Sequence, residues 1–209
     1  MGEPALLVSD VELAAWYAGK TFTCDWTTNR IPVWVEALEA YRGAPARVLE
    51  IGSWEGRSAL FFLNYLPKCR VVCVDTFGGN FEHHQDEYFA ALVPELEARF
   101  DANVAAFGDR LEKLKGPSSA VLPQLGIAGR RFDVAYIDGS HFAAYVYSDA
   151  VLTWSLMVPG GIVILDDYTW DLGNEDLERP KLGVDAFLKA IDGQYEVMHC
   201  SYQMVIAKR

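Results

Sequence analysis

Three carboxylates and one histidine follow two apolar segments of the chain, where their residue types could support metal and acid–base chemistry. Asp138 ends the first segment and His141 follows it closely, while Asp166 and Asp167 end the second. If both segments are parallel strands, the side chains emerge at the carboxyl edge of the sheet, where open α/β sheets bind ligands. Burying like charges together is unfavourable without a cation. The pattern therefore predicts a metal-assisted catalytic site.

A glycine-rich turn is the second pattern with a chemical meaning. Gly52 and Gly56 lie between an apolar run and a helical pattern. Glycines let the backbone approach a ligand closely, and the N-terminus of a helix offers free N–H groups. Trp54 stands where the dinucleotide fingerprint has its second glycine, so a nicotinamide cofactor is disfavoured. Asp75 ends the next apolar run, where it could accept both ribose hydroxyls of a nucleoside ligand.

The elements that would position these residues alternate between strands and helices. Short, β-branched, nearly continuous apolar runs predict strands covered on both faces at residues 47–51, 71–75, 133–138 and 161–166. Helical patterns lie at 32–41, 57–65, 86–100, 143–156 and 184–191. A weaker strand is predicted at 111–115, and an antiparallel hairpin at 195–199 and 203–207. The alternation predicts an α/β fold with a mostly parallel sheet.

The composition predicts one acidic domain. Of the 209 residues 51% are apolar, which is enough for one large core, and no linker interrupts the chain. We therefore expect a single domain over residues 1–209, with residues 1–31 as a cap over the sheet edge. A net charge of −11 without a Lys/Arg-rich block disfavours nucleic acid as a partner.

Neither a membrane nor a secretory route is indicated. Glu3 stands near the N-terminus in place of a basic region, and no apolar run reaches the roughly 18 residues of a membrane span. The four cysteines show no C-x-x-C spacing and are expected to be reduced, packed thiols. These features predict a cytoplasmic protein with no membrane partner.

As an ordered set, these motifs resemble the class I S-adenosylmethionine-dependent methyltransferases. The segments that carry the resemblance are the Glu50–Gly56 turn, Asp75, Tyr136–His141 and Pro159–Gly161 before the Asp166–Asp167 pair. Within that class the match is to small metal-dependent O-methyltransferases, such as those that act on catechols and macrolide sugars. Over residues 45–207 the resemblance implies a Rossmann-like three-layer sandwich, with seven strands of which the last is antiparallel.

The resemblance also implies S-adenosylmethionine as the cofactor. The residues that it places around this cofactor are Glu50, Gly52, Ser53, Gly56, Asp75, Ser118 and Asp138. By the resemblance, Asp75 would hold the ribose hydroxyls and Ser118 would contact adenine. Asp138 would approach the amino acid end of the cofactor as well as a metal.

The catalytic roles that the resemblance implies are specific. Asp138, Asp166 and Asp167 would bind Mg²⁺ or another divalent cation, and His141 occupies the position of the general base. A hard cation that holds a substrate hydroxyl lowers its pKa, so a neutral imidazole with an ordinary pKa can remove the proton. The oxygen would then attack the sulfonium methyl group. The expected acceptor is a small hydroxylated molecule.

Other interpretations of the same residues remain open from the sequence. Asp138 could end an ordinary turn, His141 could cap a helix and the 166–167 pair could lie in a solvated loop. Alternative functions are a metal-independent N- or carboxyl-methyltransferase and a non-catalytic S-adenosylmethionine-binding module. The oligomeric state is open from the sequence, although a homodimer is the commonest assembly of soluble proteins.

The acceptor pocket is expected to come from variable segments at residues 1–31, 77–90 and 168–180. Trp170 follows the Asp166–Asp167 pair closely and is placed to contact a substrate. His83 and His84 follow a Gly-Gly pair, and are expected in a lid or on the surface.

Overall fold

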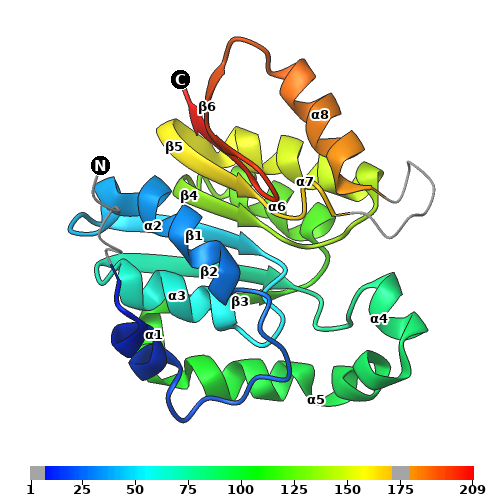
Figure 1. Cartoon of the computed structure of the whole chain (residues 1–209). Helices are drawn as coiled ribbons and strands as arrows, with labels where there is room; N and C mark the ends of the chain where they lie inside the picture. The colour runs from blue at the N-terminus through cyan, green and yellow to red at the C-terminus, as the bar shows by residue number, and fades with distance from the viewer. Residues whose placement is uncertain (1–7, 171–178) are drawn as a thin grey trace.

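A single β-sheet forms the centre of the computed structural model, which describes residues 8–170 and 179–209 (Figure 1). Its strands are β1 (Ala46–Ile51), β2 (Cys69–Asp75), β3 (Leu111–Lys115), β4 (Phe132–Ile137), β5 (Met157–Leu165), β6 (Tyr195–Cys200) and β7 (Met204–Lys208). They lie in the order β3-β2-β1-β4-β5-β7-β6, and β7 runs antiparallel to both of its neighbours while the other pairs are parallel. The predicted mostly parallel sheet is confirmed.

Helices cover both faces of the sheet (Figure 1). They are α1 (Asp10–Tyr17), α2 (Ile31–Leu38), α3 (Arg57–Tyr65), α4 (Phe81–Gln85), α5 (Glu87–Val104), α6 (Ser118–Ile127), α7 (Ala143–Leu156) and α8 (Pro180–Ala190), with 3₁₀ turns at Thr28–Arg30, Glu39–Tyr41 and Ala105–Arg110. Buried residues of α2, α3 and α5 form one apolar core, and those of α6, α7 and α8 form the other. The chain therefore has the expected three-layer, Rossmann-like sandwich.

The residue patterns locate most of these elements. The helices predicted at 57–65 and 143–156 coincide with α3 and α7, and the strand predicted at 111–115 coincides with β3. The patterns do not predict α6, because Pro123 and Gly126 interrupt its helical periodicity. The short helices α1 and α4 also lie in segments that the sequence leaves as loops.

The turn after β1 brings the backbones of three strands together. Gly52 has a φ of +81°, and a Cβ at this position would lie 2.6 Å from the carbonyl carbon of Asp138. The N–H of Asp138 donates to the carbonyl of Ile51 (2.8 Å), and the N–H of Gly52 donates to the carbonyl of Val74 (2.9 Å). The ends of β1, β2 and β4 can meet in this way because residue 52 has no side chain.

Replacing Gly52 with alanine should lower the free energy of unfolding by at least about 2 kcal/mol, because the added Cβ meets backbone and the positive φ strains alanine. Urea unfolding measures the change. Gly43→Ala is the control, since an added Cβ at Gly43 meets nothing within 4 Å. Equal stability of the two variants would contradict the close approach of the strands.

The sequence-based predictions about membrane spans and cysteines have different outcomes. None of the helices in the described part of the chain combines the length and apolar character needed to cross a membrane. All four cysteines are free thiols. Cys69 and Cys73 are buried, as expected, whereas Cys200 is exposed at the end of β6, so the expectation of packed thiols is wrong for this residue.

Candidate active site

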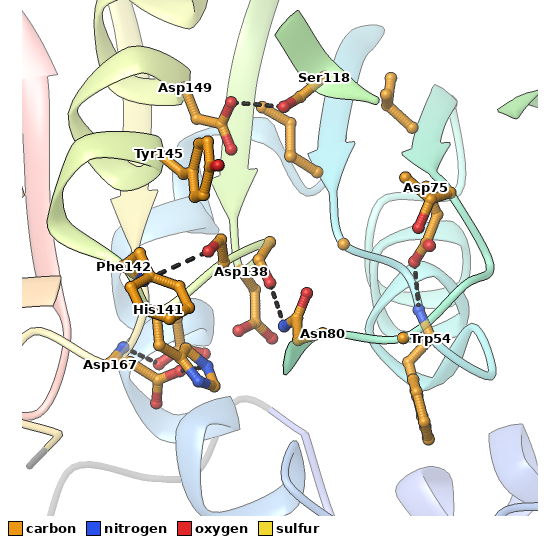
Figure 2. A pocket seen from close by; sticks show the side chains of 18 of the residues that line it. Trp54, Asp75, Asn80, Ser118, Asp138, His141, Phe142, Tyr145, Asp149 and Asp167 are labelled. Atoms are coloured by element: carbon orange, nitrogen blue, oxygen red, sulfur yellow. Dashed lines mark hydrogen bonds and ion pairs between the residues drawn. The ribbon is translucent and has the colours of Figure 1, made fainter. Parts of the chain in front are cut away.

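A cavity of about 680 Å³ opens at the carboxyl ends of the central strands. The predicted site residues that line it are Gly52, Asp75, Ser118, Asp138, His141, Asp166 and Asp167. Figure 2 shows Ser118 at one end, with His141 and Asp167 at the other. The fold thus gathers most of the predicted residues around one space.

Three predicted residues of the glycine-rich turn, Glu50, Ser53 and Gly56, do not line the cavity. Glu50 is fully buried, and its Oε2 accepts hydrogen bonds from the Ser53 hydroxyl (2.6 Å) and the Cys73 thiol (3.1 Å). Burial raises the pKa of Glu50. Gly56 starts α3 with a φ of +81°, where a Cβ would lie 3.0 Å from the ring of Phe100. These residues shape the turn and contribute no surface to the cavity.

Asp75 holds the glycine-rich turn and also faces the cavity (Figure 2). Its Oδ2 accepts hydrogen bonds from the N–H groups of Ser53 (2.7 Å) and Trp54 (2.9 Å), and its Oδ1 accepts one from Phe77 (2.6 Å). Burial raises the pKa of Asp75, and these bonds oppose that rise. Asp75 therefore caps the turns that follow β1 and β2, and its remaining lone pairs can accept ligand hydroxyls.

His141 lies between two carboxylates at one end of the cavity. Its Nε2 is 2.8 Å from Oδ2 of Asp167, and its Nδ1 is 3.3 Å from Oε1 of Glu82. Ligand atoms of Asp138, His141 and Asp167 all lie within 4.8 Å of one another. The two carboxylates suit a hard divalent cation, and the imidazole nitrogen beside them can act as a base on a molecule bound there.

Asp167 is held in an unfavourable backbone conformation by contacts from distant segments. Its φ is +55°, a region that costs a non-glycine residue about 1 kcal/mol or more. The hydroxyl of Tyr202, in the β6–β7 turn, donates to Oδ1 of Asp167 (2.6 Å). The guanidinium of Arg30 lies 3.6 Å from the centre of the Tyr202 ring. The strain thus falls on a residue that faces the cavity.

Asp166 lies beside the cluster of Asp138, His141 and Asp167, but both of its carboxylate oxygens accept hydrogen bonds from other groups of the chain. Its Oδ2 accepts from the Tyr136 hydroxyl, whose oxygen also lies 2.7 Å from Oδ2 of Asp138. Its Oδ1 accepts from the N–H of Asp167 (2.7 Å). Among the described residues, the three whose ligand atoms lie within 4.8 Å of one another are Asp138, His141 and Asp167. Asp166 is not one of them. A direct role for Asp166 in cation binding stays a prediction.

The clustered acids disfavour their own ionised forms. Burial raises the pKa of Asp138 well above its usual range, and the charges of Asp166 and Asp167 raise it further. Burial and the charge of Asp167 raise the pKa of Asp166 to about 6. A bound cation would favour the ionised carboxylates, so the residues present fit a metal site.

The surroundings of His141 correct the expectation of an ordinary pKa. Burial by itself would lower the pKa of the imidazole, but hydrogen bonding to Asp167 and Glu82 raises the pKa of His141 to about 10. The sequence does not show that Glu82, from another segment, lies beside the ring. With both carboxylates ionised, the imidazole is protonated at neutral pH, and it becomes a base only where their charge is neutralised.

Asn80, just before α4, links the loop after β2 to the loop after β4 by a hydrogen bond. The side-chain N–H of Asn80 donates to the carbonyl of Gly139 (2.5 Å), and its backbone N–H donates to Nδ1 of His83 (2.9 Å). His83 is half-buried and lines the cavity, while His84 is exposed. Burial lowers the pKa of His83. The N-x-x-H spacing is a helix-capping signal that could have located α4.

Aromatic rings form part of the cavity wall. Trp170 lies over His141 with ring centres 4.3 Å apart, so it contacts the residue expected to act on a substrate. Trp54 and His83 have ring centres 4.4 Å apart, and Trp26 packs against both. Of the three segments predicted for the acceptor pocket, residues 1–7 and 171–178 lie outside the described residues.

The far end of the cavity carries a carboxylate that the sequence does not single out. Asp149, in α7, is 4% exposed, and its Oδ1 accepts a hydrogen bond from the hydroxyl of Ser118 (2.5 Å) (Figure 2). Burial raises the pKa of Asp149 to about 6, although the bond from Ser118 opposes this. Ser118, the residue predicted to contact adenine, therefore lies beside a second polar group.

Asp149→Asn should stabilise the fold increasingly as the pH rises. A carboxyl whose folded-state pKa is raised contributes stability below its unfolded pKa, near 4, and that contribution is lost as the pH rises through 6. The difference is about 3 kcal/mol at neutral pH. Thermal unfolding of both proteins at pH 4.5, 5.5 and 7.5 checks this. A gap in melting temperature that does not change with pH would contradict the burial argument.

Comparisons with known proteins agree with this arrangement. Residues 49–168 match a family model described as a methyltransferase domain. The chain is 29% identical over 133 residues to the O-methyltransferase hkm8 of Aspergillus hancockii, and the aligned part is 63% of this chain and 46% of that protein. The chain thus spans about half the length of this curated relative.

Solved structures share the fold. The MycE methyltransferase from the mycinamycin biosynthetic pathway, in complex with Mg, SAH and mycinamycin VI, has a TM-score of 0.63 and 19% identity, over 94% of this chain and 53% of that chain. The O-methyltransferase TomG from Streptomyces achromogenes, in complex with SAM, has a TM-score of 0.59 and 18% identity, over 98% of this chain and 82% of that chain.

Proposed function

The chain belongs to the methyltransferase domain family, and we propose that it is an S-adenosylmethionine-dependent O-methyltransferase that acts on a small hydroxylated molecule with a divalent cation. The cluster of Asp138, His141 and Asp167 supports this proposal most strongly. It joins a donor set for a hard cation to an imidazole that can accept a proton, at one end of a cavity that can hold a nucleoside. The magnesium and SAH found with MycE support the same combination.

The two bound groups would supply the electrophiles. S-adenosylmethionine carries a methyl group on a sulfonium centre, and a divalent cation at Asp138 and Asp167 would lower the pKa of the acceptor hydroxyl and offset the charge that favours protonated His141. Gly52 lets the glycine-rich turn lie against the end of β4, where it lines the cavity, and Asp75 would accept the ribose hydroxyls.

Proton transfer is the task of His141. Glu82 beside Nδ1 and Trp170 over the ring hold the imidazole so that Nε2 faces Asp167. The neutral imidazole takes the hydroxyl proton at Nε2, the acceptor oxygen bonds to the methyl carbon, and the carbon–sulfur bond breaks to leave S-adenosylhomocysteine. The aromatic wall shields these reactants from water.

His141→Gln should lower kcat by at least about 100-fold while the affinity for S-adenosylhomocysteine changes by less than about threefold, because the imidazole serves proton transfer. Turnover is measured as S-adenosylhomocysteine released with magnesium and a panel of phenols, catechols and sugar alcohols. The matched control is His84→Gln on the exposed side of α4. Full activity of the His141 variant would exclude its role as the base.

The same assay separates the alternatives. Turnover that persists in excess chelator would contradict the cation and support a metal-independent N- or carboxyl-methyltransferase. Tight binding of S-adenosylhomocysteine without turnover on any acceptor would support a non-catalytic binding module.

A further inference from the structure

The hydroxyl of Tyr202 contacts one of the two carboxylate oxygens of Asp167. It donates to Oδ1 (2.6 Å), while Oδ2 of the same carboxylate lies 2.8 Å from Nε2 of His141. The φ of Asp167 is +55°, and a non-glycine residue keeps such a conformation only where surrounding contacts hold it. One oxygen of Asp167 is therefore bound to Tyr202, and the other faces the cluster that Asp167 forms with Asp138 and His141.

The sheet brings Tyr202 and Asp167 together from distant parts of the sequence. Leu165, at the end of β5, pairs with Met204, at the start of β7, in antiparallel register. The residues that follow β5 therefore lie beside the turn that precedes β7. The guanidinium of Arg30 lies 3.6 Å from the centre of the Tyr202 ring. The ring is thus held by a contact that does not involve its hydroxyl, so Tyr202→Phe removes the hydroxyl alone.

We propose that Tyr202 is a positioning residue, which raises the affinity of the site for a divalent cation by orienting the carboxylate of Asp167. Carboxylates that bind a metal are commonly oriented by a hydrogen bond from a neighbouring group, and loss of such a group lowers the affinity for the metal by about tenfold to a hundredfold. Without the hydroxyl, the side chain of Asp167 is free to rotate and its strained backbone loses a supporting contact. This role rests on the cation of the proposed function.

Calorimetric titration of magnesium into protein saturated with S-adenosylhomocysteine tests the role of Tyr202. In Tyr202→Phe the dissociation constant for magnesium should rise by about tenfold, while the affinity for S-adenosylhomocysteine should change by less than about threefold. Tyr41→Phe is the matched control, because the Tyr41 hydroxyl donates to the carbonyl of Gly160 (3.1 Å) and neither residue lines the cavity. This control should bind magnesium as the wild type does.

The magnesium dependence of turnover provides a second measurement. In Tyr202→Phe the magnesium concentration that gives half of the maximal rate should rise by about tenfold, while kcat at saturating magnesium should change by less than about threefold. A hydroxyl that only stabilises the β6–β7 turn would leave both the dissociation constant and this concentration unchanged. Urea unfolding confirms that each variant is folded under the conditions of the titration.

The two proposals fail in different ways. An affinity for magnesium that is unchanged in Tyr202→Phe would overturn the role of Tyr202 and leave the cation site of the wild type intact. A higher affinity would also overturn it, since the hydroxyl would then compete with the cation for the carboxylate. A wild-type protein that binds S-adenosylhomocysteine but gives no magnesium signal would overturn the cation proposal, and this inference with it.

Discussion

Like charges buried together at the ends of β4 and β5 are the constraint on which the site depends. The fold balances them only in part: Tyr136 hydrogen-bonds to Asp138 and Asp166, and His141 pairs with Asp167. Burial nevertheless raises the pKa of both Asp138 and Asp166. Such a cluster lowers the stability of the folded chain unless a cation binds, so its presence at the edge of an otherwise apolar sheet is better explained by function than by folding.

The elements around the sheet edge hold Asp167 and His141 in defined positions. Residue Arg30 from the N-terminal segment and Tyr202 from the β6–β7 turn fix Asp167, while α4 brings Glu82 to the other side of His141. Gly52 allows β1 and β4 to end close together. The carboxylate cluster and the Ser118–Asp149 pair therefore lie at two ends of one cavity.

The sequence predicts what local patterns encode. Continuous apolar runs locate the parallel strands, and because such strands end at one edge, the spacing of Asp138 and His141 places them in one site. Contacts from distant segments leave no local pattern: Glu82 beside His141, Tyr202 on Asp167, and Asp149 beside Ser118 all depend on how loops and helices pack. The pKa of His141 could not be predicted for the same reason, since Asp167 and Glu82, which raise it, both come from other segments.

The central claim is that the half-buried carboxylates of Asp138 and Asp167 bind a divalent cation, and calorimetric titration of magnesium into protein saturated with S-adenosylhomocysteine tests it most directly. Wild-type protein should give a saturable signal that Asp167→Asn abolishes and that Asp101→Asn, which changes an exposed carboxylate paired with Lys113, leaves intact. A wild-type protein without a magnesium signal, or an Asp167 variant that binds as the wild type does, would contradict the metal site.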